Sequence, residues 1–152
     1  MKEKKQVITP ELHDRAVQKI AELMFTFPGQ EFTPGVFHPS WVTFTNAPER
    51  KMPVKHRWMG DLYPDIVIAD TEACNRPMVI CEVATEDELA YEEGIQAKYK
   101  PDMDECSIFH LYVPEGSACA AADLILDYRY AIPTALYTYG FDEKGEIRVT
   151  PV

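Results

Sequence analysis

The chain has 152 residues, 46% of them hydrophobic and 26% charged, and a formal net charge of -10. This composition is typical of one domain with one hydrophobic core, so we predict a single domain over residues 1–152. No run of eighteen apolar residues occurs, and the chain starts with a polar helix rather than an apolar signal core, so we expect a cytoplasmic protein without a membrane partner. The four cysteines form no C-x-x-C pair, which argues against a zinc knuckle and a disulfide framework.

The negative charge is concentrated in the middle of the chain. Residues 61–105 hold thirteen acidic and three basic side chains, whereas residues 1–60 carry a net charge of +3. A surface this acidic repels phosphate, which disfavours passive nucleic-acid binding through that face. Two interpretations stay open: a solvated acidic face, and carboxylates gathered to hold a divalent metal ion.

The first part of the chain predicts one helix and one strand. Thr9 followed by Pro10 is typical of a helix start, and apolar residues at helical spacing predict a helix over residues 10–26. Residues 28–60 contain five prolines and one clearly alternating stretch, at residues 41–45. We predict an irregular segment with one strand here, which acts as a lid over a site.

From residue 61 onwards, short β-rich runs alternate with helical patterns. The runs at residues 66–69 and 78–81 predict a hairpin with a long loop. Thr85 and Glu88 have the spacing of a capping box, which predicts the start of a helix over residues 85–99.

The remaining pattern predicts the fold class. Pro101 is expected to limit the second helix, and a strand is predicted at residues 108–113. The strand at 78–83, this helix and the next strand form a β-α-β unit, whose right-handed crossover places both strands parallel in one mixed sheet. Ser117 caps a third helix, and turn residues predict a hairpin over residues 135–149. We therefore expect an α/β fold, a mixed sheet flanked by helices.

Two carboxylates stand at the ends of predicted strands. Asp65 opens the first strand of the hairpin, and Glu82 follows the apolar run of the second. An acid in so apolar a run costs desolvation unless a cation or hydrogen-bond donors meet it. If the strands pair, Asp65 and Glu82 share one end of the sheet, where two carboxylates and water suit Mg²⁺ or Mn²⁺. Water bound to such an ion is more acidic and is a natural nucleophile.

The pattern Pro64-Asp65, a sixteen-residue gap and then Glu82-x-Ala84, followed by a helix, resembles the PD-(D/E)XK nuclease superfamily. The resemblance covers roughly residues 10–113 through the order of elements and few positions by residue type. It implies a restriction-endonuclease-like core of order α-β-β-β-α-β, extended here by the C-terminal helix and hairpin. In that family the two acids bind Mg²⁺, the backbone carbonyl that follows the second acid adds to the site, and a lysine two residues after that acid orients the attacking water.

These family roles fall on named positions. The metal ligands would be Asp65, Glu82 and the carbonyl of Val83. Ala84 stands where the family places the lysine, which removes the charge stabiliser of the family mechanism.

In some family members the adjacent helix supplies the lysine. Here that helix carries Lys98 and Lys100. On an α-helix Lys100 lies about 40° from Gln96 and Lys98 about 160°, so Lys100 is the expected substitute. Gln96 partly matches the helix motif of the exonuclease-like branch and is expected to be a positioning residue.

Other residues allow more than one interpretation. Glu11 and Glu22 are the alternatives for an additional acid from the first helix. The basic cluster within residues 50–57 is a phosphate contact or a solvated loop. Three aromatic residues stack on bases or cover an edge of the core: Trp41, Trp58 and Tyr63. The four histidines show no mutual spacing typical of a metal site.

Three functions remain open at this stage. The first is a Mg²⁺- or Mn²⁺-dependent nuclease that cleaves phosphodiesters with metal-activated water, using Asp65, Glu82, Gln96 and Lys100. The second is an inactive nuclease-fold protein used for protein interaction or assembly; Ala84 and the net charge favour it. The third is an unrelated acidic α/β domain, in which the two acids would lie far apart. Separately, the apolar tail hairpin either forms the edge of a homodimer or pairs within the chain.

Overall fold

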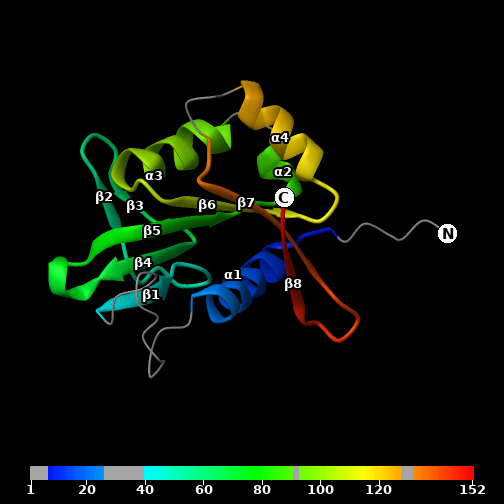
Figure 1. Ribbon diagram of the computed structural model, residues 1–152, viewed down its shortest axis with the longest axis horizontal. Helices are drawn as coiled ribbons and strands as arrows, with labels where there is room; N and C mark the ends of the chain where they lie inside the picture. The colour runs from blue at the N-terminus through cyan, green and yellow to red at the C-terminus, as the bar shows by residue number, and fades with distance from the viewer. Residues whose placement is uncertain (1–6, 26–39, 91–92, 128–131) are drawn as a thin grey trace.

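A mixed β-sheet is the centre of the fold (Figure 1). The computed structural model describes residues 7–25, 40–90, 93–127 and 132–152. Its strands are β1 (Trp41–Thr45), β2 (Val54–His56), β3 (Gly60–Leu62), β4 (Ile66–Asp70), β5 (Arg76–Val83), β6 (Phe109–Pro114), β7 (Ala135–Phe141) and β8 (Ile147–Pro151). Its helical elements are α1 (Pro10–Met24), the 3-10 turn η1 (Thr71–Ala73), α2 (Glu86–Leu89), the π-helical turn η2 (Ile95–Tyr99), α3 (Lys100–Glu105) and α4 (Ala118–Asp127).

The sheet has the strand order β1-β4-β5-β6-β7-β8, and β2 and β3 form a separate ribbon. β1, β4 and β5 run antiparallel, β6 and β7 continue parallel to β5, and β8 returns antiparallel to β7. The parallel pairing of β5 with β6 confirms the predicted β-α-β unit. Helix α1 covers one face of the sheet, and α2, α3 and α4 cover the other (Figure 1). An α/β fold with a mixed sheet and flanking helices is thus confirmed.

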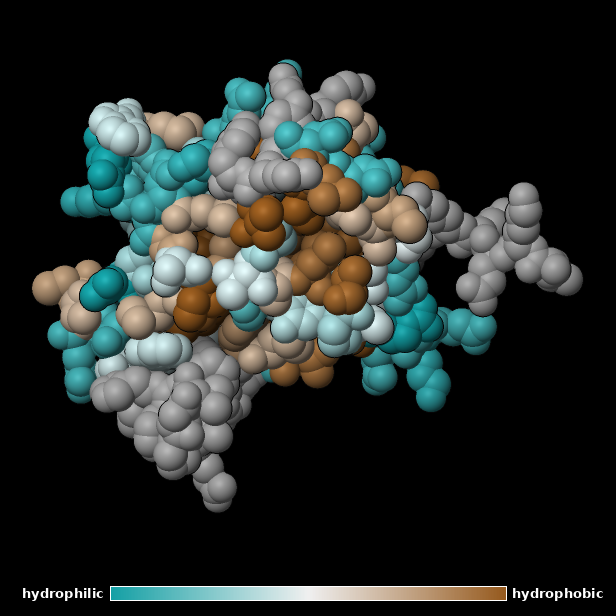
Figure 2. Space-filling model, turned by 45° about the horizontal axis from the view of Figure 1, so that its top comes forward, coloured by the Kyte–Doolittle hydropathy of each residue, from teal (hydrophilic) through white to brown (hydrophobic). Residues whose placement is uncertain are grey.

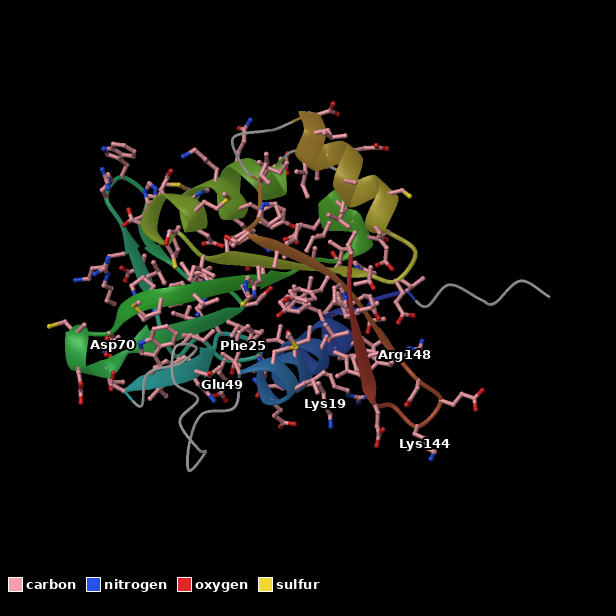
Figure 3. The ribbon with its side chains drawn as sticks, viewed as in Figure 1. Lys19, Phe25, Glu49, Asp70, Lys144 and Arg148 are labelled. Carbon is pink, nitrogen blue, oxygen red and sulfur yellow. The ribbon has the colours of Figure 1, made fainter. Side chains whose placement is uncertain are left out.

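Helix α1 packs a stripe of small and β-branched residues against the sheet. Ala16, Val17 and Ile20 are fully buried in the core cluster on this face. Phe25, just after the helix, lies between α1 and the sheet (Figure 3), where its ring centroid is 5.9 Å from that of His110. An isolated helix of this length is only marginally stable in water. The burial of this stripe against the sheet therefore stabilises α1.

The start of α1 follows the prediction. The side chain of Thr9 accepts a hydrogen bond of 3.2 Å from the Leu12 amide. We expect Thr9→Ala to lower the free energy of unfolding by about 1 kcal/mol, because one orphan amide loses its partner. Urea denaturation measures the difference, and Thr9→Ser, which keeps the hydroxyl, is the control. Equal stability of the alanine variant and the wild type would contradict this role.

The segment over residues 28–60 contains more structure than predicted. The strand at 41–45 is confirmed as β1, but the ribbon of β2 and β3 was not predicted, because strands of three residues are too short to show alternation. Asn46 ties the segment together: its amide group donates to the carbonyls of Met52 and Pro64 at 2.8 and 2.7 Å. Residues 26–39 lie outside the described residues.

The helix predicted over residues 85–99 is divided and extends further. Its start is confirmed, since the Thr85 hydroxyl accepts the Glu88 amide at 3.4 Å. Pro101 does not end it, because the helical path continues through η2 and α3. In the π-helical turn the Lys100 amide donates to the carbonyl five residues back, and Pro101 takes the second position of α3, where proline is tolerated.

The tail hairpin is confirmed, but its first strand is not an edge. β7 pairs with β6 on one side and β8 on the other, which agrees with the alternative that the tail hairpin pairs within the chain. Tyr139 is fully buried, and its hydroxyl donates to the Ala84 carbonyl at 2.6 Å. The edges of the sheet are β1 and β8.

The surface in Figure 2 carries apolar side chains near its centre and hydrophilic ones toward its sides. Exposed apolar residues of the described chain include Leu126 on α4 and Ile132 before β7.

No helix among the residues that the structure describes has the length and apolar character needed to cross a membrane.

Candidate functional site

Asp65 and Glu82 lie side by side at one end of strands β4 and β5. The antiparallel register pairs Ile66 with Cys81, which places Asp65 opposite Glu82. The Asp65 amide donates to Glu82 Oε1 at 3.1 Å, and the Val83 amide donates to Asp65 Oδ2 at 2.8 Å. Both residues are buried, with relative exposures of 9% and 3%. The juxtaposition expected from the sequence is therefore present, and it argues against an unrelated domain with distant acids.

His13 of α1 is a further partner of Asp65. Its Nε2 lies 3.2 Å from Asp65 Oδ2, and its Nδ1 lies 3.2 Å from Asp14 Oδ1. Burial disfavours the charged imidazole, but hydrogen bonds to Asp65 and Asp14 and their charges outweigh it and raise the pKa of His13 to about 9. His13 therefore brings a positive charge to Asp65 at neutral pH.

A third carboxyl group, Asp102 of α3, reaches the two acids from the other face of the sheet. It is 1% exposed and hydrogen-bonds with Glu82, while its Oδ2 is buried with no hydrogen-bond partner among the described residues. Burial raises the pKa of Asp102 to about 7, against the lowering effect of its hydrogen bond to Glu82. Burial and the charges of Asp102 and Asp65 raise the pKa of Glu82 well above its usual range. Three desolvated carboxyl groups at one point favour a bound proton or cation.

Lys98 of η2 brings a positive charge to the same site. Its Nζ pairs with Glu88 Oε1, while Glu88 Oε2 accepts the Tyr99 hydroxyl at 2.8 Å. Burial disfavours the ammonium, but Glu88 and then Glu82 raise the pKa of Lys98, so the group stays charged. The Lys98 side chain is 49% exposed, so it borders the site rather than being enclosed in it.

A cavity of about 330 Å³ joins these groups. Asp65, Glu82 and Asp102 line it together with Lys98 and Arg50. The remaining lining residues are Ala97 of η2 and, from the segment that precedes β4, Met59, Asp61, Leu62, Tyr63 and Pro64. Part of the region expected to be a lid thus borders the site.

Two predicted site residues lie outside this cavity. Neither Gln96 nor Lys100 belongs to its lining among the described residues, and Gln96 is exposed. Lys100 instead pairs with Asp104 on α3. The choice of Lys100 over Lys98 assumed an α-helix in which Gln96 faces the site. In the structure Gln96 is exposed, and residues 95–99 form a π-helical turn to which the α-helical angles do not apply. Lys98 lines the cavity, and the roles expected for Gln96 and Lys100 stay predictions.

The first-helix acids do not reach the cavity either. Glu11 is exposed, and Glu22 lines a separate cavity with Gln18 and Phe25. The residue of α1 that contacts the acids is His13, which hydrogen-bonds with Asp65 but is not among the described residues that line the cavity. The sequence carries a signal for it, because His13 precedes the buried Val17 and Ile20 by four and seven residues and so lies on the same face of α1.

Asp102 and Glu88 were also missed by the sequence interpretation. The helix was expected to stop at Pro101, which left Asp102 in a loop. On a helix that continues, Asp102 lies four residues after Lys98 and shares its face. Glu88 was expected to complete a capping box but pairs with Lys98 and Tyr99 instead.

The site offers a pair of carboxylates for a hard cation but no larger cluster of ligands among the described residues. No group of three or more His, Cys, Asp or Glu side chains in the described part of the chain is arranged as a metal-holding cluster. Mg²⁺ does not require one, since it is often held by one or two carboxylates, waters and substrate phosphate. Asp65 and Glu82 provide such a pair, and the unpartnered Asp102 Oδ2 beside them is an oxygen without a donor. The donor chemistry therefore fits Mg²⁺ or Mn²⁺.

Comparison of the chain with protein-family models, with curated proteins and with solved structures gave no match.

Proposed function

We propose that the chain is a Mg²⁺- or Mn²⁺-dependent nuclease that hydrolyses phosphodiesters at the cavity formed by Asp65, Glu82 and Lys98. The observation that carries this proposal is the pair of buried acids. Two adjacent strands hold them with reciprocal backbone hydrogen bonds, and they face one cavity with a charged lysine. Burying this much acid is costly unless a ligand compensates for it.

The topology supports membership of the PD-(D/E)XK superfamily. The supporting observation is the element order: helix α1, the antiparallel strands β1, β4 and β5, further helices and the parallel strand β6 follow one another, and the resemblance implies a core of order α-β-β-β-α-β. The β2–β3 ribbon is an insertion in that order. Asp65 lies directly before β4 and Glu82 lies near the end of β5, which is compatible with the positions that the resemblance implies for the two acids.

Each residue of the site has a distinct role in this proposal. Asp65 and Glu82 would hold the ion with their carboxylate oxygens, and the Val83 carbonyl would be the third ligand, as the resemblance implies. The ion, when bound, makes a coordinated water more acidic and neutralises charge on the phosphate. His13 fixes the orientation of Asp65 through the 3.2 Å contact to Oδ2. Lys98 stabilises the negative charge that develops on the attacked phosphate.

Lys98 compensates for the missing strand lysine. Ala84 is fully buried in the same hydrophobic cluster as Leu89, Ile95 and Tyr99, so a lysine there would bring a charged group into this cluster. Lys98 enters from the helix on the same face of the sheet and keeps its charge through Glu88. Gln96 and Lys100, expected earlier as catalytic residues, have no part in the proposed mechanism.

Calorimetric titration with Mn²⁺ tests the metal site. We expect saturable binding to the wild type and none to Glu82→Gln, because the amide keeps the shape of the side chain but loses the charge. Glu115→Gln is the matched control: Glu115 pairs with Arg148 away from the cavity, and its loss should leave binding unchanged. Binding equal in wild type and Glu82→Gln, or absent from both, contradicts the proposal.

The second candidate is an inactive nuclease-fold protein used for interaction or assembly. The buried Ala84 and the net charge of -10 favour it. It predicts no Mn²⁺ binding by the wild type and no cleavage of labelled DNA or RNA in Mn²⁺. Metal binding together with cleavage that Glu82→Gln abolishes would exclude it.

A further inference from the structure

The ribbon of β2 and β3 presents large exposed side chains at its tip. Trp58 is 80% exposed and Met59 is 51% exposed, and both lie in the turn that joins the two strands. The ribbon projects at the upper left of Figure 1, outside the six-stranded sheet. A single exposed apolar residue is ordinary, but a tryptophan and a methionine side by side at a turn make an apolar tip open to contact.

The tip is held in a defined conformation. His56 is buried, and its Nδ1 accepts hydrogen bonds from the Trp58 and Met59 amides at 3.2 and 3.1 Å. Since Nδ1 accepts, Nε2 carries the proton and donates to Asp104 Oδ2 at 2.9 Å. The ring thus anchors the turn to α3, so Trp58 is presented by a fixed backbone. Preorganisation of this kind lowers the entropic cost of binding.

Two arginine–aromatic pairs extend the tip toward the candidate active site. The Arg57 guanidinium lies 5.4 Å from the Trp58 ring centroid, and that of Arg50 lies 4.4 Å from the Tyr63 centroid. Tyr63 is 38% exposed. Arg50, Met59 and Tyr63 line the same cavity as Asp65 and Glu82. The aromatic tip and the acids are therefore parts of one continuous surface.

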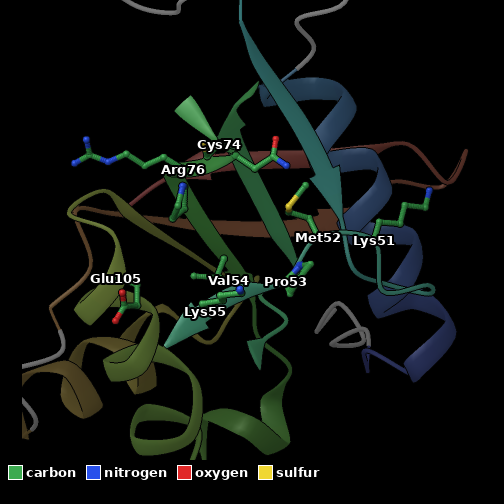
Figure 4. Close-up of a pocket in the computed structure, with 10 residues that line it drawn as sticks. Lys51, Met52, Pro53, Val54, Lys55, Cys74, Arg76 and Glu105 are labelled. Atoms are coloured by element: carbon green, nitrogen blue, oxygen red, sulfur yellow. The ribbon is translucent and has the colours of Figure 1, made fainter. Parts of the chain in front are cut away.

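The charge of the ribbon is opposite to that of the whole chain. Residues 49–63 hold four basic and two acidic side chains, a net +2 in a chain of -10. A cavity of about 650 Å³ beside β2 also has mostly basic charged residues in its lining. Lys51 and Arg76 lie on opposite sides of this cavity and Lys55 lies between them, while Glu105 on α3 is the acidic residue of the lining (Figure 4). Basic side chains interleaved with aromatic ones suit a polyanion whose flat groups are accessible.

We infer that the ribbon binds single-stranded nucleic acid, with a base stacked on Trp58 and backbone phosphates contacting the basic side chains of residues 50–57. This inference rests on the proposed function for the choice of nucleic acid and narrows it to a single strand. In a duplex the bases are stacked on one another and their faces are not accessible to Trp58, whereas in a single strand they are. A strand lying along the ribbon reaches the cavity through Arg50 and Tyr63.

Fluorescence anisotropy of a short labelled thymidine oligonucleotide, in EDTA and low salt, tests the inference. Because EDTA prevents cleavage, binding is measured separately from activity. We expect the single strand to bind more tightly than a duplex of the same length, and Trp58→Ala to weaken it about tenfold. Trp58→Phe should retain most of the affinity, and Leu126→Ala, which removes an equally apolar exposed side chain from α4, should leave it unchanged. Lys55→Met should reduce the slope of log affinity against log salt by about 0.7.

The outcomes separate this inference from the proposed function. Oligonucleotide binding that depends on Trp58, without cleavage in Mn²⁺, supports the inference and contradicts the nuclease. Cleavage at an unchanged rate in Trp58→Ala, with unchanged affinity, contradicts the inference and leaves the nuclease standing. Equal affinity for duplex and single strand, no binding of either, or Trp58-dependent binding to phosphatidylserine vesicles instead of the oligonucleotide would each overturn the inference.

Discussion

Replacing Lys98 with methionine should slow phosphodiester cleavage about a hundredfold, whereas Lys100→Met should leave the rate within about twofold of the wild type. Methionine preserves the length of the side chain and removes its charge. Lys98 lines the cavity with Asp65 and Glu82, but Lys100 pairs with Asp104. The measurement is the single-turnover rate on a labelled oligonucleotide in saturating Mn²⁺ and with protein at saturating excess over the oligonucleotide, so that weaker substrate binding does not enter the comparison.

Two further variants test whether the loss of rate comes from the loss of the Lys98 charge. Lys98→Arg should recover part of the rate, because it keeps a cation beside Glu88. Glu88→Gln should lower the rate less than Lys98→Met, since it removes the carboxylate that holds the lysine but not the lysine itself. Equal rates for Lys98→Met and Lys100→Met would exclude Lys98 as the substitute for the strand lysine.

Asp102→Asn should raise the free energy of unfolding at pH 8 by roughly 2 kcal/mol in the presence of EDTA. The pKa of Asp102 is raised to about 7, whereas an unfolded aspartate titrates near its usual pKa of about 4. Between these two pH values the folded protein binds the extra proton, so stability falls as pH rises through this window. Asparagine does not titrate, and its amide group can donate to Glu82. The gain in the free energy of unfolding of Asp102→Asn over the wild type should therefore be small near pH 4 and complete by pH 8, as measured by urea denaturation.

Asp104→Asn is the matched control, two residues further along α3, and it should have the opposite effect. The hydrogen bond from His56, and then the contact with Lys100, lower the pKa of Asp104. Its charge therefore stabilises the fold above about pH 4, and this contribution is lost as pH falls through the lowered pKa. We expect Asp104→Asn to lower stability at pH 7 by about 1 kcal/mol. Parallel pH profiles for the two variants would contradict both assignments.

Features that depend on neighbouring residues in the sequence could be predicted from the sequence alone. Thr9 and Pro10 define the start of α1, and the apolar runs that became β4, β5 and β6 were placed correctly because each is flanked by turn or capping residues. Asp65 and Glu82 were singled out because a carboxylate at the end of an apolar strand is costly, and a hairpin brings the ends of its strands together. These inferences depend on neighbours in sequence or on one turn.

The rest of the site depends on the tertiary structure. His13 and Asp102 reach the two acids from opposite faces of the sheet, and no local pattern shows that α1 and α3 meet at the end of β4. Which of Lys98 and Lys100 lines the cavity depends on a π-helical turn that the sequence pattern did not indicate and on the partner of each lysine, Glu88 or Asp104. Sequence alone thus determined which strands carry the acids. Packing decided which charges surround them, because electrostatic interactions depend on distances between segments far apart in the chain.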